Sequence, residues 1–184
     1  MSMSTSTPRI RRSLTALLLL VVAAVLTGAC ACTPGGGTGK AIGGPAQAEE
    51  PSRVAIPSLG VDSPLMRLGR GDDGTARVPP PEKGRTAGWY RGSAKPGTRG
   101  AAVIIGHDAT PDGKAVFRDL HRIKEGDVID VERGDGKILH FTVTGTEKVA
   151  ESAFPTRKVY GETREKALRL VTCAGDLIVY AKLA

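Results

Sequence analysis

The stretch LRLVTCAG at residues 168–175 combines a predicted strand, a thiol and a turn. Side chains alternate along a strand, so Leu168 and Leu170 share one face while Arg169 and Cys173 share the other. Gly175 signals a turn directly after the strand. We therefore expect Cys173 at the rim of the fold, at the end of a strand, and not in the middle of a core.

Cys173 is expected to have no disulfide partner within the globular part. The chain has 184 residues and three cysteines, and the other two, Cys30 and Cys32, lie in or just after an N-terminal apolar segment. In an exported domain, a leftover cysteine forms an intermolecular link or remains a free reactive thiol. The alternative is a buried structural thiol, because free cysteine is among the most buried residue types.

The N-terminus carries a targeting signal. Three arginines precede an apolar, charge-free segment, and this pattern predicts export. We predict that residues 1–32 form a signal peptide or a single-pass membrane anchor, since their apolar segment approaches the ~20 residues that span a bilayer. Three outcomes stay open: a retained anchor, cleavage near residues 27–29, and lipid attachment at Cys30 or Cys32. The preceding positive charge places the domain outside the cell membrane.

Composition separates a linker from the folded part and argues against a nucleic-acid partner. Residues 33–51 are rich in Gly, Pro and Ala and predict a flexible linker, which leaves residues 52–184 as the domain. The chain holds 26 basic and 19 acidic residues. Four of the basic and one of the acidic residues lie in residues 1–49, which leaves 22 and 18, a net charge of +4. These charges are interleaved and form no basic, aromatic stripe, so no nucleic acid is expected.

The domain has the pattern of a mainly β fold. Alternating or continuous apolar runs predict strands at 53–56, 101–106, 127–132, 137–144, 168–173 and 177–183. Turn residues separate them, and helix is limited to one or two turns at 116–122 and one at 162–166. Several short strands separated by turns predict a closed or nearly closed barrel.

A histidine near Cys173 would favour its thiolate form and make it a useful nucleophile. Of three histidines, His107 directly follows the apolar run at 101–106, where a strand end opens onto a loop. His121 lies among charged residues, and His140 alternates with the apolar face of its strand, so both are expected to be solvated. His107 is therefore the candidate partner, and the alternative is a loop histidine with local hydrogen bonds.

Several motifs, in order along the chain, resemble those of the sortase family. Residues 170–173 (LVTC) resemble the strand-end motif that carries the sortase cysteine, and residues 106–108 (GHD) resemble the Gly-His element. The run between them also matches, with Phe117, Leu120 and the segment 123–127 (IKEGD). Matches to the actinobacterial class F group lie at 56–62 (IPSLGVD), 87–90 (AGWY) and 153–156 (AFPT). The resemblance covers about residues 52–184.

The resemblance implies a sortase-like eight-stranded β-barrel with one or two short helices, on the outer face of a Gram-positive cell. It implies a cysteine transpeptidase that cleaves a C-terminal LPxTG-like sorting signal of secreted proteins. The acyl group is held as a thioester and passed to an amine of a cell-wall precursor or pilin. Cys173 would be the nucleophile, His107 the general acid and base, and Thr172 a substrate-positioning residue. No cofactor or metal is expected, since the acidic residues have no calcium-loop spacing.

One element of the family pattern is missing from this chain. Sortases carry an arginine near the start of the last strand, after a loop that follows the cysteine. Here Cys173 runs through Ala174, Gly175 and Asp176 straight into the last predicted strand, and no arginine follows Arg169. Removing one oxyanion donor costs about 10²–10³ in rate.

Replacements for that arginine are few. Arg169 shares the face of Cys173 and is kept as a candidate substrate-binding residue, although it lies about four residues back along the strand. Lys182 would pair near Leu168, and an approach of Arg85, Arg91 or Arg118 depends on the fold. Three functions stay open: an active or weakened class F sortase, a degenerate sortase-like domain that binds signals without turnover, and an exported barrel with a structural thiol.

Overall fold

The structure, a computed structural model, describes residues 49–72 and 74–184. The predicted signal peptide or anchor at 1–32 and most of the predicted linker at 33–51 lie outside these residues. Within the described part, no helix has the length and apolar character needed to span a membrane. The predictions for the N-terminal segment therefore stay predictions.

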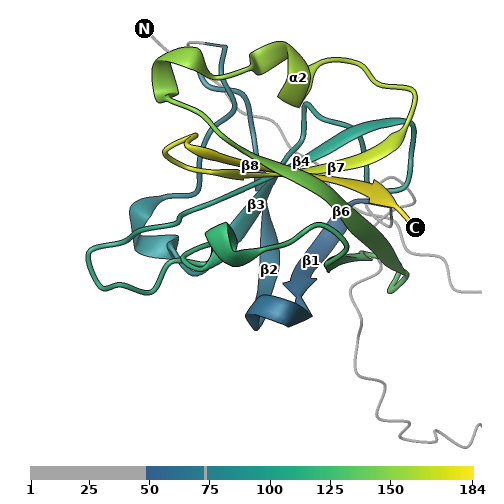
Figure 1. The fold of residues 1–184 in the computed structure, drawn as a ribbon, viewed down its shortest axis with the longest axis horizontal. Helices are drawn as coiled ribbons and strands as arrows, with labels where there is room; N and C mark the ends of the chain where they lie inside the picture. Colours follow the sequence, from purple (N-terminus) through teal and green to yellow (C-terminus); the bar gives the residue numbers. More distant parts are fainter. Residues whose placement is uncertain (1–48, 73) are drawn as a thin grey trace, which may run out of the picture. The chain divides into compact units, whose positions relative to one another are not determined.

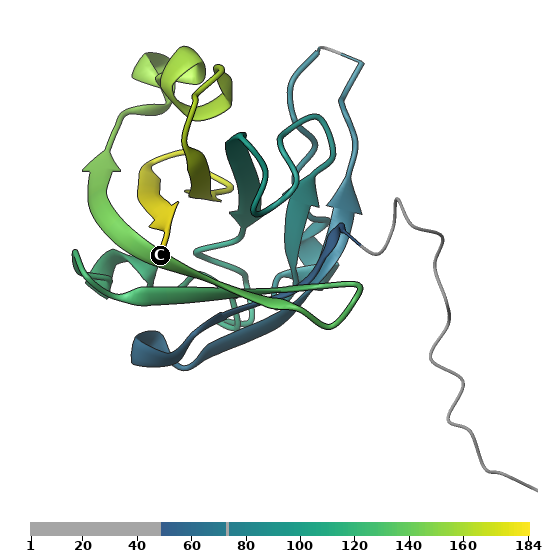
Figure 2. The same cartoon turned by 90° about the vertical axis from the view of Figure 1, so that its right-hand side faces the viewer.

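Eight strands form a closed barrel in the order β1-β2-β3-β4-β7-β8-β6-β5, and Figures 1 and 2 show it from two directions. This confirms the mainly β, eight-stranded architecture. The strands are β1 (Pro51–Ile56), β2 (Val61–Leu68), β3 (Ala87–Tyr90), β4 (Gly100–Gly106), β5 (Val128–Arg133), β6 (Ile138–Lys148), β7 (Lys166–Thr172) and β8 (Leu177–Leu183).

Six strands match the predicted ranges within a few residues, and two were not predicted. The missed strands are β2 and β3. Pro64 lies inside β2, whose burial does not alternate, and proline usually argues against a strand with partners on both sides. β3 has only four residues, one of them Gly88. Both are stabilised by pairing with each other in parallel, a non-local contact that has no signature in local periodicity.

The helical elements are short. At 116–122 the structure forms the 3₁₀ turn η3 (Leu120–Arg122), and the helical turn predicted at 162–166 is wrong. The α-helix α2 (Thr156–Tyr160) lies earlier, between Pro155 and Gly161, and Lys166 already belongs to β7. Proline suits the start of a helix and glycine its end, and these two residues set the bounds. The remaining 3₁₀ turns are η1 (Pro57–Leu59), η2 (Pro81–Lys83) and η4 (Glu151–Ala153).

Apolar side chains pack on both faces of β7. Leu168 and Leu170 belong to the large cluster inside the barrel. Val171 packs in a second cluster on the outer face, beneath Val159 of α2, which is fully buried. Full burial of a valine side chain contributes about 1.5–3 kcal/mol. The connection between β6 and β7, which carries α2, is thereby held against the barrel face to which Cys173 belongs.

The barrel brings the ends of β4 and β7 together. The two strands run parallel with Gly106 opposite Thr172. β7 then turns through residues 173–176 into β8, with which it pairs antiparallel. The tight hairpin expected after Cys173 is therefore confirmed. The residues that directly follow β4 and β7, His107 and Cys173, emerge at the same edge of the barrel.

Candidate active site

Cys173 begins the turn that joins β7 to β8. Its backbone N–H donates a hydrogen bond to the carbonyl oxygen of Gly106, at an N···O distance of 2.9 Å. The turn closes through Gly175 N–H to Thr172 O at 2.8 Å, and Gly175 has a φ of 69°, a conformation that favours glycine. The side chain of Cys173 is half-buried, and its thiol is free. The expected position at a rim is confirmed.

His107 follows β4 directly, as predicted, and is half-buried. Its Nε2 lies 2.8 Å from the carbonyl oxygen of Pro79, in the loop between β2 and β3. A carbonyl only accepts hydrogen bonds, so Nε2 carries a proton when this bond forms, and Nδ1 of the neutral ring is left as the acceptor. Within the described part of the chain no hydrogen bond joins His107 to Cys173; their common location follows from the strand register.

The end of β4 is held in place by a close approach that only glycine permits. A Cβ atom on Gly106 would lie 2.6 Å from the ring of Phe117 and 2.7 Å from Val116. Phe117 is buried, and its N–H donates to the carbonyl oxygen of His107 at 2.8 Å. The hydrogen bond between Phe117 and His107 therefore joins the two ends of the loop 107–117 and fixes the backbone of the histidine.

Burial raises the pKa of the Cys173 thiol to about 12, and the negative charge of Asp108 adds to the effect. Burial disfavours the charged thiolate, and a nearby carboxylate repels it. At neutral pH the thiol is therefore protonated in the unliganded protein. Nucleophilic attack by Cys173 thus requires a base that takes its proton when a substrate is bound.

A cavity of about 600 Å³, here called the Cys173 cavity, opens beside the thiol. Its walls come from the ends of β4 and β7, from the loop between β2 and β3, and from the connection between β6 and β7. Most of the walls are apolar or aromatic: Ala76, Val78, Tyr90, Ile105, Phe154, Tyr160 and Val171. Among the described lining residues one is charged, Arg70.

Arg70 is a candidate that sequence reasoning missed. It lies in the loop after β2, bridges to Ala76 across that loop, and donates from Nε to the carbonyl oxygen of Gly74 at 2.7 Å. Nothing in the local sequence connects it with Cys173. The two residues line one cavity because the loop between β2 and β3 reaches the ends of β4 and β7, where Pro79 contacts His107. A local sequence pattern contains no signal for such a contact.

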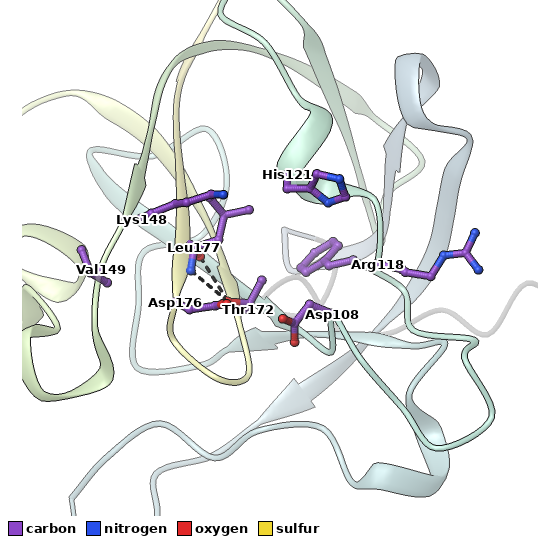
Figure 3. Close-up of a pocket in the computed structure, with 9 residues that line it drawn as sticks. Asp108, Arg118, His121, Lys148, Val149, Thr172, Asp176 and Leu177 are labelled. Atoms are coloured by element: carbon purple, nitrogen blue, oxygen red, sulfur yellow. Dashed lines mark hydrogen bonds between the residues drawn. The ribbon is translucent and has the colours of Figure 1, made fainter.

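A second cavity, of about 440 Å³ and here called the Asp108 cavity, lies at the same end of the barrel (Figure 3). Its charged walls contrast with the first cavity. The lining residues are Asp108, Phe117, Arg118, His121, Lys148, Val149, Thr172, Asp176 and Leu177. Thr172 lines both cavities, so the β7–β8 turn separates them.

The side chain of Thr172 is 2% exposed and stabilises this turn. Its hydroxyl donates to Oδ1 of Asp176 at 2.5 Å and accepts from the N–H of Leu177 at 3.1 Å (Figure 3). These bonds hold the backbone that carries Cys173. A direct role of Thr172 in positioning substrate stays a prediction, since its hydroxyl is already engaged within the turn.

Arg169 shares the outer face of β7 with Val171, but it lines neither cavity. Its guanidinium stacks on the ring of Tyr180 at 4.8 Å and donates to the carbonyl oxygen of Leu168 at 3.0 Å. Burial lowers its pKa, and Tyr180 and Glu165 partly offset that effect. The structure thus does not bring Arg169 to Cys173, and its proposed contact with substrate stays a prediction.

The other cations considered from sequence lie elsewhere. Arg85 lines two different cavities, and Arg91 is exposed after β3. Arg118 lines the Asp108 cavity but directs its guanidinium away from it (Figure 3), toward Asp119. Lys182 lies opposite Ala167 and pairs with Glu165, close to the position expected for it.

The two other histidines are exposed, as expected. His140 pairs with Asp130 through Nδ1 at 2.7 Å. His121 lies in η3 and lines the Asp108 cavity, a location that the sequence did not indicate. In the described residues, no group of three or more His, Cys, Asp or Glu side chains is placed to hold a metal ion.

Comparisons with known proteins agree with this architecture. The family model of the sortase domain matches residues 54–184, whereas no curated protein matches the chain. Among solved structures, sortase A from Corynebacterium diphtheriae is similar at 22% identity and a TM-score of 0.55. That match covers 72% of this chain and 59% of the other, so this chain spans less than two thirds of that relative.

Two further solved structures belong to other sortase classes. Sortase C-1 from Actinomyces oris has 23% identity and a TM-score of 0.57, with 72% of each chain covered. The sortase D5 transpeptidase from Clostridium perfringens has 24% identity and a TM-score of 0.55, with 72% of this chain and 77% of that chain covered. These similarities show the fold and do not select a class. Since the family model matches most of its length, the chain belongs to the sortase domain family.

Proposed function

We propose that this protein is a cysteine transpeptidase in which Cys173 is the nucleophile and His107 the general acid and base. The observation that carries the proposal is the pairing of Gly106 with Thr172, because His107 and Cys173 directly follow these two residues at one edge of the barrel. Cys173 also lines a cavity there. A thiol and an imidazole on neighbouring strand ends suit acyl transfer. Membership in the sortase family supports the same reaction class.

The proposed reaction has two steps. In acylation, the thiol of Cys173 loses its proton to His107 and attacks the scissile carbonyl; the C–S bond forms, the C–N bond breaks, and His107 returns the proton to the leaving amine. In the second step, His107 takes a proton from the incoming neutral amine, the new C–N bond forms, the C–S bond breaks, and His107 passes the proton to the released sulfur of Cys173. The raised pKa of Cys173 agrees with proton transfer during the attack and not with a thiolate at rest.

The Cys173 cavity is proposed to hold an LPxTG-like sorting signal. Its volume of about 600 Å³ lies within the range of ligand sites, about 300–1,000 Å³. Its apolar walls, with Val78, Ile105 and Phe154, suit leucine and proline side chains. Arg70 on the same wall offers a guanidinium to the peptide carbonyls, which is the interaction that the chain lacks after Cys173.

We propose class F for this sortase on the strength of the motifs at 56–62, 87–90 and 153–156. The domain would work on the outer face of a Gram-positive cell membrane, anchored by residues 1–32. Its partners would be secreted proteins with a C-terminal sorting signal and the amine of a cell-wall precursor or pilin.

The second candidate is a sortase-like domain that binds sorting signals with little or no turnover. Two observations favour it. No arginine follows Arg169 in the sequence, and the pKa of the Cys173 thiol is raised to about 12. Such a domain would use the Cys173 cavity for binding alone.

Trapping of an acyl-enzyme distinguishes these functions. A sorting-signal peptide with a thiol-reactive group at the scissile position is incubated with the protein, and labelling is measured by mass spectrometry. The transpeptidase proposal predicts labelling of Cys173 that is lost in Cys173→Ala, together with release of the C-terminal fragment from an unmodified peptide. Binding that survives Cys173→Ala, with no cleavage by the parent protein, would establish the binding domain instead. If the peptide neither binds to the protein nor labels it, Cys173 is a structural thiol.

A further inference from the structure

The two cavities meet at the residue that precedes the thiol. Thr172 lines both, with Cys173 in the wall of the first and Asp108 in the wall of the second. In a two-step transfer, the acyl chain still occupies the first cavity when the second substrate arrives. The acceptor therefore needs a separate approach to the thioester, and the Asp108 cavity reaches Thr172, the residue next to Cys173 in the chain.

The carboxylate of Asp108 is suited to hold a cation there. Figure 3 shows it directed into the cavity, on the side of Thr172. In the described part of the chain it makes no hydrogen bond or ion pair, in contrast to Asp176, which accepts the hydroxyl of Thr172. Its charge acts on the sulfur of Cys173, so the carboxylate and the thiol belong to one electrostatic environment.

The remaining walls narrow the chemistry of the ligand. Lys148 and His121 line the same cavity, so one wall offers a carboxylate and another offers cationic or hydrogen-bond-donating groups. Such a site fits an ammonium group on a molecule that also carries a carboxylate. An apolar or wholly cationic ligand would leave these charges unpaired.

We propose that the Asp108 cavity binds the acceptor amine and that Asp108 holds its ammonium group next to the thioester on Cys173. This inference rests on the proposed transpeptidase function. Asp108 binds the ammonium but takes no proton. The ammonium first loses one proton to water; the free amine then attacks and its second proton passes to His107. The new C–N bond forms, the C–S bond breaks, and His107 returns that proton to the released sulfur. The acceptor class is a primary amine on a peptide with a free carboxylate.

The test measures how the acyl-enzyme divides between water and amine. The full chain is acylated with a sorting-signal peptide, and hydrolysed and aminolysed products are quantified against the concentration of triglycine. This ratio is determined after acylation, so it does not depend on the acylation rate. Asp108→Asn should raise the triglycine concentration that gives equal products by about tenfold, because a hydrogen bond to a charged group is lost. Asp108→Glu, which keeps the carboxylate, should need a triglycine concentration close to that of the parent protein.

Two controls sharpen the result. Asp62→Asn removes an exposed carboxylate of β2 outside both cavities and should leave the ratio unchanged. Triglycinamide, which lacks the free carboxylate, should compete less well than triglycine with the parent protein, and Lys148→Met should remove that difference. Identical triglycine curves for the parent and Asp108→Asn would overturn the proposal.

Failure of the proposed function is separately visible. If the parent protein forms no acyl-enzyme, triglycine binding to Cys173→Ala is measured by calorimetry. Binding that Asp108→Asn weakens then still supports the amine site, and absence of binding overturns it.

Discussion

The two cavities beside the β7–β8 turn differ in chemistry although they share a wall. The Cys173 cavity has mostly apolar and aromatic walls, with Arg70 as the charged residue among its described lining, whereas the Asp108 cavity is lined by carboxylates and cations. Apolar walls remove water from a peptide and strengthen each polar contact made there. Charged walls remain hydrated and select ligands by charge. The contrast assigns the acyl donor to the first cavity and the amine to the second.

The shared wall itself is stabilised by hydrogen bonds. Thr172 is buried, and its hydroxyl links Asp176 and Leu177 across the turn. The backbone of Cys173 is in turn bonded to Gly106. A boundary held by these hydrogen bonds can keep two substrates apart on either side of the residue that precedes the thiol.

The largest expected effect comes from removing the base. His107→Ala should lower the rate of acylation by about 10²–10⁴, the usual contribution of general acid–base catalysis. Peptide cleavage followed by chromatography measures it. His140→Ala is the matched control, because His140 is exposed and pairs with Asp130. Equal acylation rates for His107→Ala and the parent protein would remove His107 from the mechanism and break the assignment of the first cavity.

The next effect concerns the strand end that carries His107. Gly106→Ala places a Cβ 2.6 Å from the ring of Phe117, and such overpacking costs about 1–3 kcal/mol in the free energy of unfolding. Urea denaturation measures the change. Gly145→Ala is the control, since a Cβ there meets an ordinary contact at 3.6 Å and should change stability far less. Equal free energies of unfolding for the two variants would show that the close packing of Gly106 against Phe117 does not contribute to stability.

The pH dependence of alkylation tests the environment of the thiol. Only the thiolate reacts, and the pKa of Cys173 is raised to about 12. In the unliganded protein, the rate of reaction with iodoacetamide should therefore rise roughly tenfold per pH unit from pH 7 to about pH 11. The same protein unfolded in urea should level off above the ordinary thiol pKa of about 8.5. A plateau near pH 8 in the folded protein would contradict a thiol that is protonated at rest.

The smallest expected effect comes from removing Arg70, the charged residue among the described lining of the Cys173 cavity. Arg70→Ala should weaken binding of a sorting-signal peptide to Cys173→Ala about tenfold, the value of one hydrogen bond from a charged donor. Fluorescence anisotropy with a labelled peptide measures it. Arg77→Ala, in the same loop but outside the cavity, is the matched control. Equal loss in both variants would indicate a non-specific charge effect and not a contact made by Arg70.

Prediction from sequence was most successful where the pattern is local. In β6, Leu139, Phe141 and Val143 alternate with polar residues, and all three are buried. The continuous apolar run at 101–106 became β4, whose residues 101–106 are all buried. β2 was missed because it contains Pro64 and its burial does not alternate, and β3 because it has only four residues, one of them Gly88. The turn expected at 162–166 failed because Pro155 and Gly161 place the helix earlier.

The sequence by itself determined the family, the alternating strands, and the position of Cys173 and His107 at strand ends. Each of these follows from residues that are close in the chain, whose periodicity and order are visible without a fold. Only the tertiary structure decided that Arg70 lines the same cavity as Cys173 while Arg169 stacks on Tyr180, and that Thr172 lines both an apolar and a charged cavity. These arrangements depend on loops that close over the barrel end, and such contacts between distant residues are set by packing and not by local pattern.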